Sequence, residues 1–383
     1  MSQPFENTIK EYLKSVYGKN SAEVLQHSYL LQYLVHKTKS ANKGSKARGS
    51  FGSLYAIYVI VEDYIQKGFL KKGGYSNYEG AIFSNLFKRQ RELPFGEKLQ
   101  NHALNHRMNE EFMKFFPIEG IVPPIMRNRE TQRYWVNENY LKFKVNGKEI
   151  NIAKDIIEII NKYIETKRDA FSQFIEQCKQ LQTIGSAKEK EVKNFIIGLL
   201  SPNVDARLFE IVSYSILKYY YDGQSIYWGY SLDEIEEDSL KLYKTGRTNA
   251  NDGGIDFVMK PLGRFFQVTE TLDFKKYFLD IDKIEKYPIS FVIKTLDPEP
   301  LIRQKLSSDA LKTYVIKSVV KKYLSCIEEI INIPILLDYF NSVVEDGKLD
   351  DVLNEIIVQS KVEFNYTDSE DEEEEEEEDI RLL

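Results

Sequence analysis

The chain has 383 residues, 42% of them hydrophobic and 29% charged, a composition typical of a globular protein with its own core. The two cysteines, Cys178 and Cys326, lie far apart, which excludes a disulfide framework and a cysteine-based zinc site. No stretch approaches the ~18 apolar residues of a membrane span, and the first residues lack an apolar signal segment. We therefore expect a cytoplasmic protein without a membrane partner.

The formal net charge of −7 conceals an uneven distribution. From Asp368 to Asp379, 11 of 12 residues are acidic, and without these 11 negative charges the net charge changes from −7 to +4. The body of the chain is thus mildly basic, as expected of a protein that binds phosphates. The acidic tail is predicted to be disordered, and it could keep the protein soluble, occupy a basic cleft or bind a partner protein.

The N-terminal part of the chain is predicted to be mainly helical. Residues 1–35 and 153–180 carry apolar residues at helical spacing, and residues 51–67 form a strongly apolar helix or buried strand.

Three segments contain basic and polar residues that are predicted to bind phosphates or nucleic-acid bases. The segment from Lys37 to Ser50 has no apolar period, so it is either a phosphate-binding loop or a solvated surface loop. A second group of arginines is interleaved with Tyr134 and Trp135, as in base-reading surfaces and also in salt-bridged ones. The third segment is the glycine-rich stretch before Asp256. The predicted contacts are Lys39, Lys43, Lys46, Arg48, Arg127, Arg129, Arg247 and Asn249.

The stretch from residue 202 to residue 296 alternates helices with short strands, which indicates an α/β core. Pro202 suits the first turn of its helix, and Gly-Gly and Lys-Pro-Leu-Gly turns bound the strands. The predicted elements are a helix over 202–221, a strand over 225–230, a hairpin of strands 255–259 and 264–270, a helix over 274–287 and a strand over 288–294.

The hairpin carries the candidate chemistry. Asp256 follows a Gly-Gly turn, and Gln267 and Thr269 lie two residues apart on the return strand, so their side chains share one face. Mg²⁺ takes oxygen ligands from one or two carboxylates, and a bound ion activates water for attack on phosphorus. We predict that Asp256 and Gln267 bind Mg²⁺, with Glu210 on the preceding helix as a further ligand. Taken singly, each residue also has an ordinary structural interpretation, as a turn aspartate, a buried amide or a solvated helix position.

Gly-Gly-Ile-Asp256 followed by Phe-Phe-Gln267-Val-Thr269 resembles the core of the PD-(D/E)xK nucleases. That core places an aspartate at the start of one strand and Glu/Gln-x-Lys on the next, in a mixed central sheet flanked by helices. The motif is similar to those of Mrr-like and type II restriction endonucleases, and residues 246–259 most resemble the ApaLI-like group. The resemblance covers about a quarter of the chain, over residues 200–296.

This resemblance implies Mg²⁺-dependent hydrolysis of phosphodiester bonds in double-stranded DNA at a short palindromic site. It also implies a homodimer in which each subunit cuts one strand, and a cognate DNA methyltransferase as a genetic partner. An extra acid on the helix before the first core strand, where Glu210 lies, is another feature of these enzymes.

One position departs from the motif, because Thr269 occupies the place of the lysine. A threonine hydroxyl can orient water but carries no charge. Lys275 and Lys276, at the start of the next helix, could supply the cation, whereas Lys260 is about 13 Å away along the strand. Glu270 faces the other side of an ideal strand, and a bulge would be needed to bring it to the site.

The expected organisation has four parts. The catalytic core covers 195–300, and C-terminal helices that pack on it cover 301–362. The helical N-terminal region, which we assign to DNA recognition and dimerisation, covers 1–180, and the tail covers 366–383. Three alternatives remain open: a DNA-binding protein with an inactive nuclease core, a defence nuclease acting on RNA or nucleotides, and an interaction protein that uses its acidic tail. The chain has no Gly-x-x-x-x-Gly-Lys-Ser/Thr sequence, which argues against ATP-driven movement on DNA.

Overall fold

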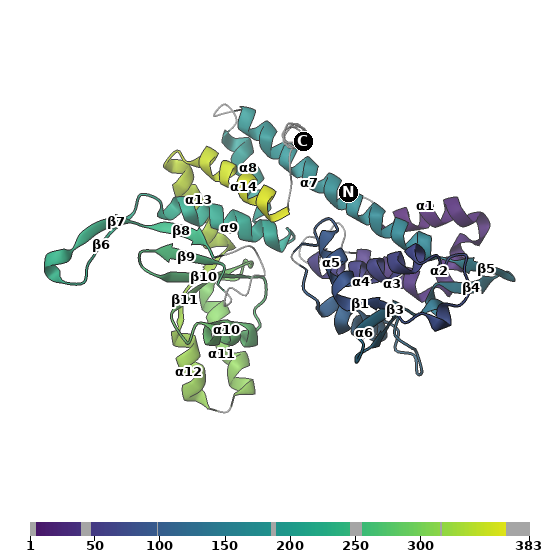
Figure 1. Ribbon diagram of the computed structural model, residues 1–383. Helices are drawn as coiled ribbons and strands as arrows, with labels where there is room; N and C mark the ends of the chain where they lie inside the picture. Colours follow the sequence, from purple (N-terminus) through teal and green to yellow (C-terminus); the bar gives the residue numbers. More distant parts are fainter. Residues whose placement is uncertain are drawn as a thin grey trace, which may run out of the picture. The chain divides into compact units, whose positions relative to one another are not determined.

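The computed structural model describes residues 5–39, 47–97, 99–184, 189–245, 255–314 and 316–364. The chain divides into two compact units, Met1–Phe174 and Ile175–Leu383, and the division falls inside the long helix α7 (Ala153–Ile184). None of the helices in the described ranges combines the length and the apolar character that crossing a lipid bilayer requires. The protein is a mixed α/β structure (Figure 1).

Helices make up most of the first unit, as the sequence predicts. The segment over 51–67, for which both a helix and a buried strand were considered, is a helix. The helices are α1 (Phe5–Tyr17), α2 (Ser21–His27), α3 (Tyr29–Thr38), α4 (Ala47–Gln66), α5 (Phe83–Glu92), α6 (Met108–Phe115) and the start of α7.

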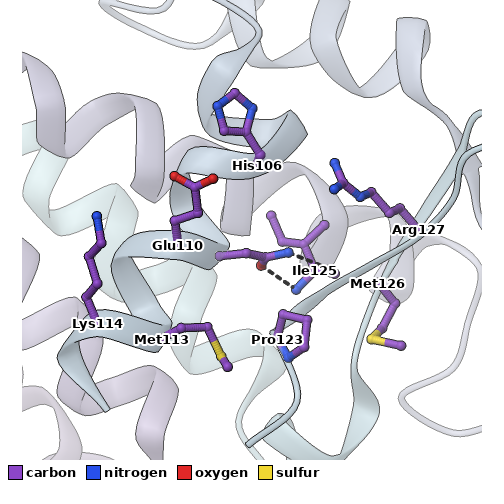
Figure 2. A pocket seen from close by; sticks show the side chains of 9 residues that line it. His106, Glu110, Met113, Lys114, Pro123, Ile125, Met126 and Arg127 are labelled. Atoms are coloured by element: carbon purple, nitrogen blue, oxygen red, sulfur yellow. Dashed lines mark hydrogen bonds between the residues drawn. The ribbon is translucent and has the colours of Figure 1, made fainter. Parts of the chain in front are cut away.

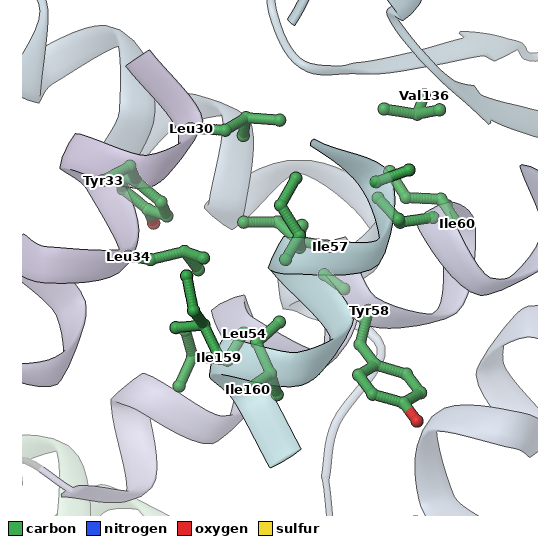
Figure 3. Close-up of a cluster of buried hydrophobic side chains, with 14 of the residues drawn as sticks. Leu30, Tyr33, Leu34, Leu54, Ile57, Tyr58, Ile60, Val136, Ile159 and Ile160 are labelled. Carbon is green, nitrogen blue, oxygen red and sulfur yellow. The ribbon is translucent and has the colours of Figure 1, made fainter. Parts of the chain in front are cut away.

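Helix α4 is the centre of the first unit. Its residues from Leu54 to Val61 are all buried, so it is apolar around its whole circumference, as expected of a central helix. Figure 3 shows Leu54 and Ile57 of α4 beside residues of α3 and of α7, such as Leu34 and Ile159. The long apolar run in the sequence therefore serves a helical core.

Two small antiparallel sheets complete the first unit. A three-stranded sheet has the order β1-β3-β2, and a two-stranded hairpin follows it in the sequence. A short π-helical turn, Ala103–Arg107, leads into α6. The strands are β1 (Ala81–Ile82), β2 (Ile125–Asn128), β3 (Arg133–Val136), β4 (Lys142–Val145) and β5 (Lys148–Asn151).

A mixed five-stranded sheet of order β12-β11-β10-β9-β8 forms the centre of the second unit. Strands β8, β9 and β10 are antiparallel neighbours, whereas β10, β11 and β12 run parallel. Strand β11 is buried along its whole length, which is typical of a strand covered on both faces. The strands are β8 (Lys241–Lys244), β9 (Phe257–Lys260), β10 (Arg264–Thr269), β11 (Ile289–Ile293) and β12 (Ile327–Asn332).

Helices cover both faces of this sheet (Figure 1). On one face, α10 (Phe274–Lys283), α11 (Glu299–Thr313) and α12 (Lys317–Ser325) share an apolar core with Phe291 and its neighbours on β11. On the other face lie α9 (Ala206–Tyr221), α13 (Ile333–Glu345) and α14 (Leu349–Phe364), which contact one another. Helix α8 (Glu189–Leu199) contacts α9 and α14. We call the two surfaces of the sheet the α10 face and the α9 face.

Three local expectations are corrected. Helix α9 begins at Ala206 rather than Pro202, because the Asp205 side chain caps it by accepting a hydrogen bond from Arg207 N. The strand predicted over 225–230 exists as β6 (Ser225–Trp228), but it pairs with β7 (Glu236–Ser239) in a separate hairpin. The C-terminal region predicted as helical contributes β12, a run rich in isoleucine, to the sheet.

Candidate functional site

Asp256 lies at a bend immediately before β9 and is held against β10. Its backbone N–H donates to Phe266 O at 2.9 Å, and its carboxylate Oδ2 accepts a hydrogen bond from Val268 N at 2.7 Å. Val268 lies between Gln267 and Thr269 on the strand. The hairpin therefore brings the Asp256 carboxylate beside the strand segment that carries the other two predicted residues.

Gln267 and Thr269 share the α10 face of the sheet. Thr269 Oγ1 accepts a hydrogen bond from Lys276 of α10, whereas Phe266, of opposite parity, has its ring 6.2 Å from that of Tyr221 on α9. Because side chains alternate along a strand, Gln267 points with Thr269 towards α10. This agrees with the shared face expected from their spacing.

Gln267 has an unsatisfied polar atom in a buried place. The residue is 8% exposed, and its Nε2 donates to Val268 O at 3.3 Å. Its Oε1 is buried, and no hydrogen-bond donor of the described residues reaches it. An unsatisfied buried acceptor costs about 1–3 kcal/mol. A cation or another electrophilic ligand at Oε1 would offset that cost.

Lys276 places a cation beside Thr269. Its Nζ lies 3.1 Å from Thr269 Oγ1. One of the three lysines named from the sequence therefore contacts Thr269, the residue that departs from the motif. Lys260 Nζ instead lies 5.3 Å from the centre of the Tyr243 ring. Helix α10 can present Lys276 here because Asp273 caps its first turn through the backbone N–H of Lys275.

The two glutamates predicted for the site pair with lysines on the α9 face. Glu210 Oε1 lies 3.4 Å from Lys244 Nζ, and both side chains are largely buried. Glu270 Oε1 lies 2.7 Å from Nζ of Lys294, whose ammonium is 5.9 Å from the Phe209 ring of α9. Neither lysine was identified from the sequence, because each pairing joins residues that are distant along the chain.

The donor set beside β10 fits a hard cation better than a soft one. Within the described residues, no group of three or more His, Cys, Asp and Glu side chains is placed to hold a metal ion. The Asp256 carboxylate and the Gln267 amide oxygen are oxygen donors, and Mg²⁺ needs only one or two carboxylates because it keeps several waters. The unsatisfied Gln267 Oε1 is the observation that favours an ion at this position.

The predicted DNA contacts have mixed outcomes. Lys39 follows α3 and is exposed, and Arg129 is exposed in the turn between β2 and β3. Arg127 donates through Nη1 to the backbone and side-chain oxygens of Asn105, at 2.5 and 3.0 Å. Arg48 lies within α4. The others lie outside the described residues: Lys43, Lys46, Arg247 and Asn249.

A pocket of about 630 Å³ opens beside Arg127 in the first unit. In Figure 2, His106, Glu110 and Lys114 follow one another along the same helical face, opposite β2. The Asn109 amide forms two hydrogen bonds with the backbone of Ile125, at 2.8 and 3.0 Å, and so covers part of the edge of β2. The helical spacing of the three titratable side chains is visible in the sequence, but the strand they face is not.

Comparisons with protein-family models, with curated proteins and with solved structures find no match to this chain.

Proposed function

We propose that this chain is a Mg²⁺-dependent endonuclease that cuts double-stranded DNA at specific sites, in the manner of a type II restriction enzyme. The observation that carries the proposal is the group beside β10. It consists of the Asp256 carboxylate on the Val268 amide, the unsatisfied oxygen of Gln267, and the Lys276 ammonium on Thr269.

The arrangement of the second unit supports this proposal. Helix α9, the antiparallel strands β8 to β10, helix α10 and the parallel strand β11 follow one another in the sequence. A mixed sheet flanked by helices, with an aspartate before one strand and a glutamine on the next, is what the resemblance to PD-(D/E)xK nucleases implies, whereas Thr269 departs from it. Likeness of fold alone does not establish function, so the proposal depends on the chemistry of the site.

Asp256 and Gln267 would hold the ion through a carboxylate and an amide oxygen. When bound, Mg²⁺ lowers the pKa of a coordinated water and offsets negative charge on the phosphate. The Val268 amide fixes the orientation of the Asp256 carboxylate, because it binds Oδ2. The predicted further ligand, Glu210, would have to leave its ion pair with Lys244 to reach the same ion.

Lys276 and Thr269 would perform the task of the motif lysine together. The ammonium donates to Thr269 Oγ1, so the hydroxyl hydrogen is left to donate elsewhere, to a water or a phosphate oxygen. The positive charge of Lys276 would stabilise negative charge that develops on the phosphate. Glu270, the other residue predicted to position water, is engaged by Lys294 and would have to leave that ion pair to take part.

The partners follow from the same proposal. Double-stranded DNA is the substrate, and a homodimer would cut the two strands of a palindromic site. Lys39 and Arg129 are the exposed members of the predicted DNA contacts. A cognate DNA methyltransferase would protect the cell's own sites.

A digest of long, mixed-sequence duplex DNA tests the proposal directly. Wild-type protein and the Asp256→Ala variant are incubated with the DNA, each with Mg²⁺ and with a chelator. We expect discrete fragments only from the wild type with Mg²⁺, with a loss of at least about a thousandfold in rate for the variant. Asp309→Asn, on α11, is the matched control, because the Asp309 carboxylate is paired with Lys312 of its own helix and lies outside the candidate site.

Two results would contradict the proposal. DNA that is bound but remains intact with Mg²⁺ would indicate an inactive nuclease core, and Thr269→Lys would then be the reversion to examine. Cleavage of single-stranded RNA in preference to duplex DNA would indicate the alternative substrate class.

A further inference from the structure

The β6–β7 hairpin exposes several large apolar side chains. Tyr230 is 93% exposed, Leu232 88% and Tyr227 71%, and Trp228 and Ile235 are also exposed. Figure 1 shows the hairpin extending away from the five-stranded sheet of its own unit. A group of exposed apolar side chains of this kind is typical of an interaction site, whereas single exposed apolar residues are common on any protein surface.

The tip of the hairpin has a defined shape. A Cβ at Gly229 would lie 2.2 Å from Glu234 O, so the loop is closed tightly against the start of β7. The rings of Trp228 and Tyr230 contact each other edge to face, with centroids 5.9 Å apart. An isolated two-stranded hairpin is only marginally stable in water. A surface that covers these rings would therefore stabilise the hairpin as well as bind it.

The charge of the hairpin indicates what covers it. Residues 223–240 contain five acidic side chains and no lysine, arginine or histidine. Nucleic acid is therefore excluded as an occupant, because its phosphates would be repelled. Without these five acids and the 11 of the tail, the rest of the chain has nine more basic than acidic residues. The rest of a second copy of the chain thus carries a net charge opposite to that of the hairpin, which favours their association.

The available area is sufficient for a dimer. At about 200 Å² for a large side chain, the five exposed residues offer on the order of 600 Å² of apolar surface in each copy. A two-fold symmetric dimer uses two hairpins and buries an equal area on the two receiving surfaces. The total exceeds the ~1,600 Å² of a standard stable interface.

We propose that the β6–β7 hairpin is a dimerisation arm that docks on a second copy of this chain, with its aromatic tip in the centre of the contact and its acidic side chains at the rim. This proposal goes beyond the nuclease function and does not depend on it. It names the surface through which two copies associate.

Analytical ultracentrifugation of the purified full chain over a concentration series tests the arm. We expect a dimer for the wild type, and for the Tyr230→Ser/Leu232→Ser variant a dissociation constant raised at least about tenfold. The Leu279→Ser/Leu296→Ser variant is the matched control, because both leucines lie in the same unit, are more than half exposed and are outside the hairpin. Circular dichroism checks that all three proteins are folded equally well.

A photo-crosslinking amino acid in place of Tyr230 identifies the occupant. Two preparations with different tags are mixed, irradiated and separated under denaturing conditions, with Tyr287, a half-exposed tyrosine outside the hairpin, as the control position. We expect a covalent species that carries both tags from position 230 only. A monomeric wild type at every concentration, or an arm variant that dimerises as the wild type does, would overturn the proposal, and so would the absence of a doubly tagged product.

Discussion

The two faces of the five-stranded sheet differ in whether their buried polar side chains have partners. On the α9 face, Glu210 and Glu270 each have a lysine within ion-pair distance. On the α10 face beside β10, Gln267 Oε1 has no donor among the described residues, although it is buried. An ion pair satisfies both of its members, whereas an unsatisfied buried atom costs stability and requires an explanation, for which we propose a bound ion at Gln267.

Arg264, also on the α9 face, is likewise satisfied by neighbouring side chains. Its guanidinium contacts Glu329 and donates to Ser290 Oγ at 3.1 Å and to the Tyr221 hydroxyl at 3.3 Å. Burial raises the pKa of Tyr221 to about 12, although the charge of Arg264 opposes the rise. The hydroxyl therefore stays neutral at physiological pH and serves as an acceptor. Every partner of Arg264 is thus provided by the protein itself.

Gln267→Met is the most diagnostic change on the α10 face, because it should raise stability while it lowers activity. Methionine removes the unsatisfied buried oxygen, so we expect the free energy of unfolding to rise by about 1 kcal/mol. Loss of the oxygen ligand should lower the DNA cleavage rate by at least about a hundredfold. Urea unfolding and the duplex digest measure the two quantities. A variant that is less stable than the wild type and fully active would contradict the proposal that Gln267 binds an ion on the α10 face.

Lys276→Ala should lower the cleavage rate by about a hundredfold, because the ammonium at Thr269 is lost. Lys275→Ala is the matched control, because Lys275 precedes Lys276 in the same helical turn and is also exposed. It should change the cleavage rate less than threefold. Thr269→Lys added to Lys276→Ala places an amine on the strand itself and should restore activity. Equal losses for the two lysines would show that general positive charge, rather than this contact, matters.

Lys294→Met tests the α9 face by stability. The Lys294 side chain is 2% exposed and that of Glu270 is 30% exposed. Water can therefore partly hydrate the Glu270 carboxylate once the lysine is removed. We expect a loss of about 2 kcal/mol in the free energy of unfolding, below the 3–5 kcal/mol of a fully buried broken pair. The cleavage rate per folded molecule should be unchanged. Lys305→Met, on α11, provides an exposed control with an expected change within about 0.5 kcal/mol.

The sequence predicts what is local and misses what is distant. Strands β9, β10 and β11 were placed within three residues, because glycines and prolines bound short apolar runs. The neighbourhood of Asp256 and Gln267 follows from one tight hairpin and was predicted for that reason. Strand β8 was missed, since in Lys241–Lys244 only Leu242 is buried and a charged strand gives no apolar pattern.

The contacts of the lysines show the same limit. Lys276 was one of three candidates from the sequence, and only the packing of α10 on the sheet distinguishes it. The partnership of Lys294 with Glu270 requires β11 to lie parallel to β10, which depends on the crossover through α10. Pairing of distant strands is a property of the whole fold, so no local pattern records it.

Glu210→Gln tests whether the ion pairs of the α9 face are purely structural. The sequence predicts this carboxylate as a further metal ligand, whereas the structure pairs it with Lys244 at 3.4 Å. If the pair is chiefly structural, the amide keeps a hydrogen bond to Lys244 and the cleavage rate falls by only about tenfold, less than the losses expected for Gln267→Met and Lys276→Ala. The dependence of the rate on Mg²⁺ concentration gives the decisive measurement. A thousandfold loss with a raised Mg²⁺ requirement, as expected for Asp256→Ala, would place Glu210 at the ion and make Lys244 a partner only until the ion binds.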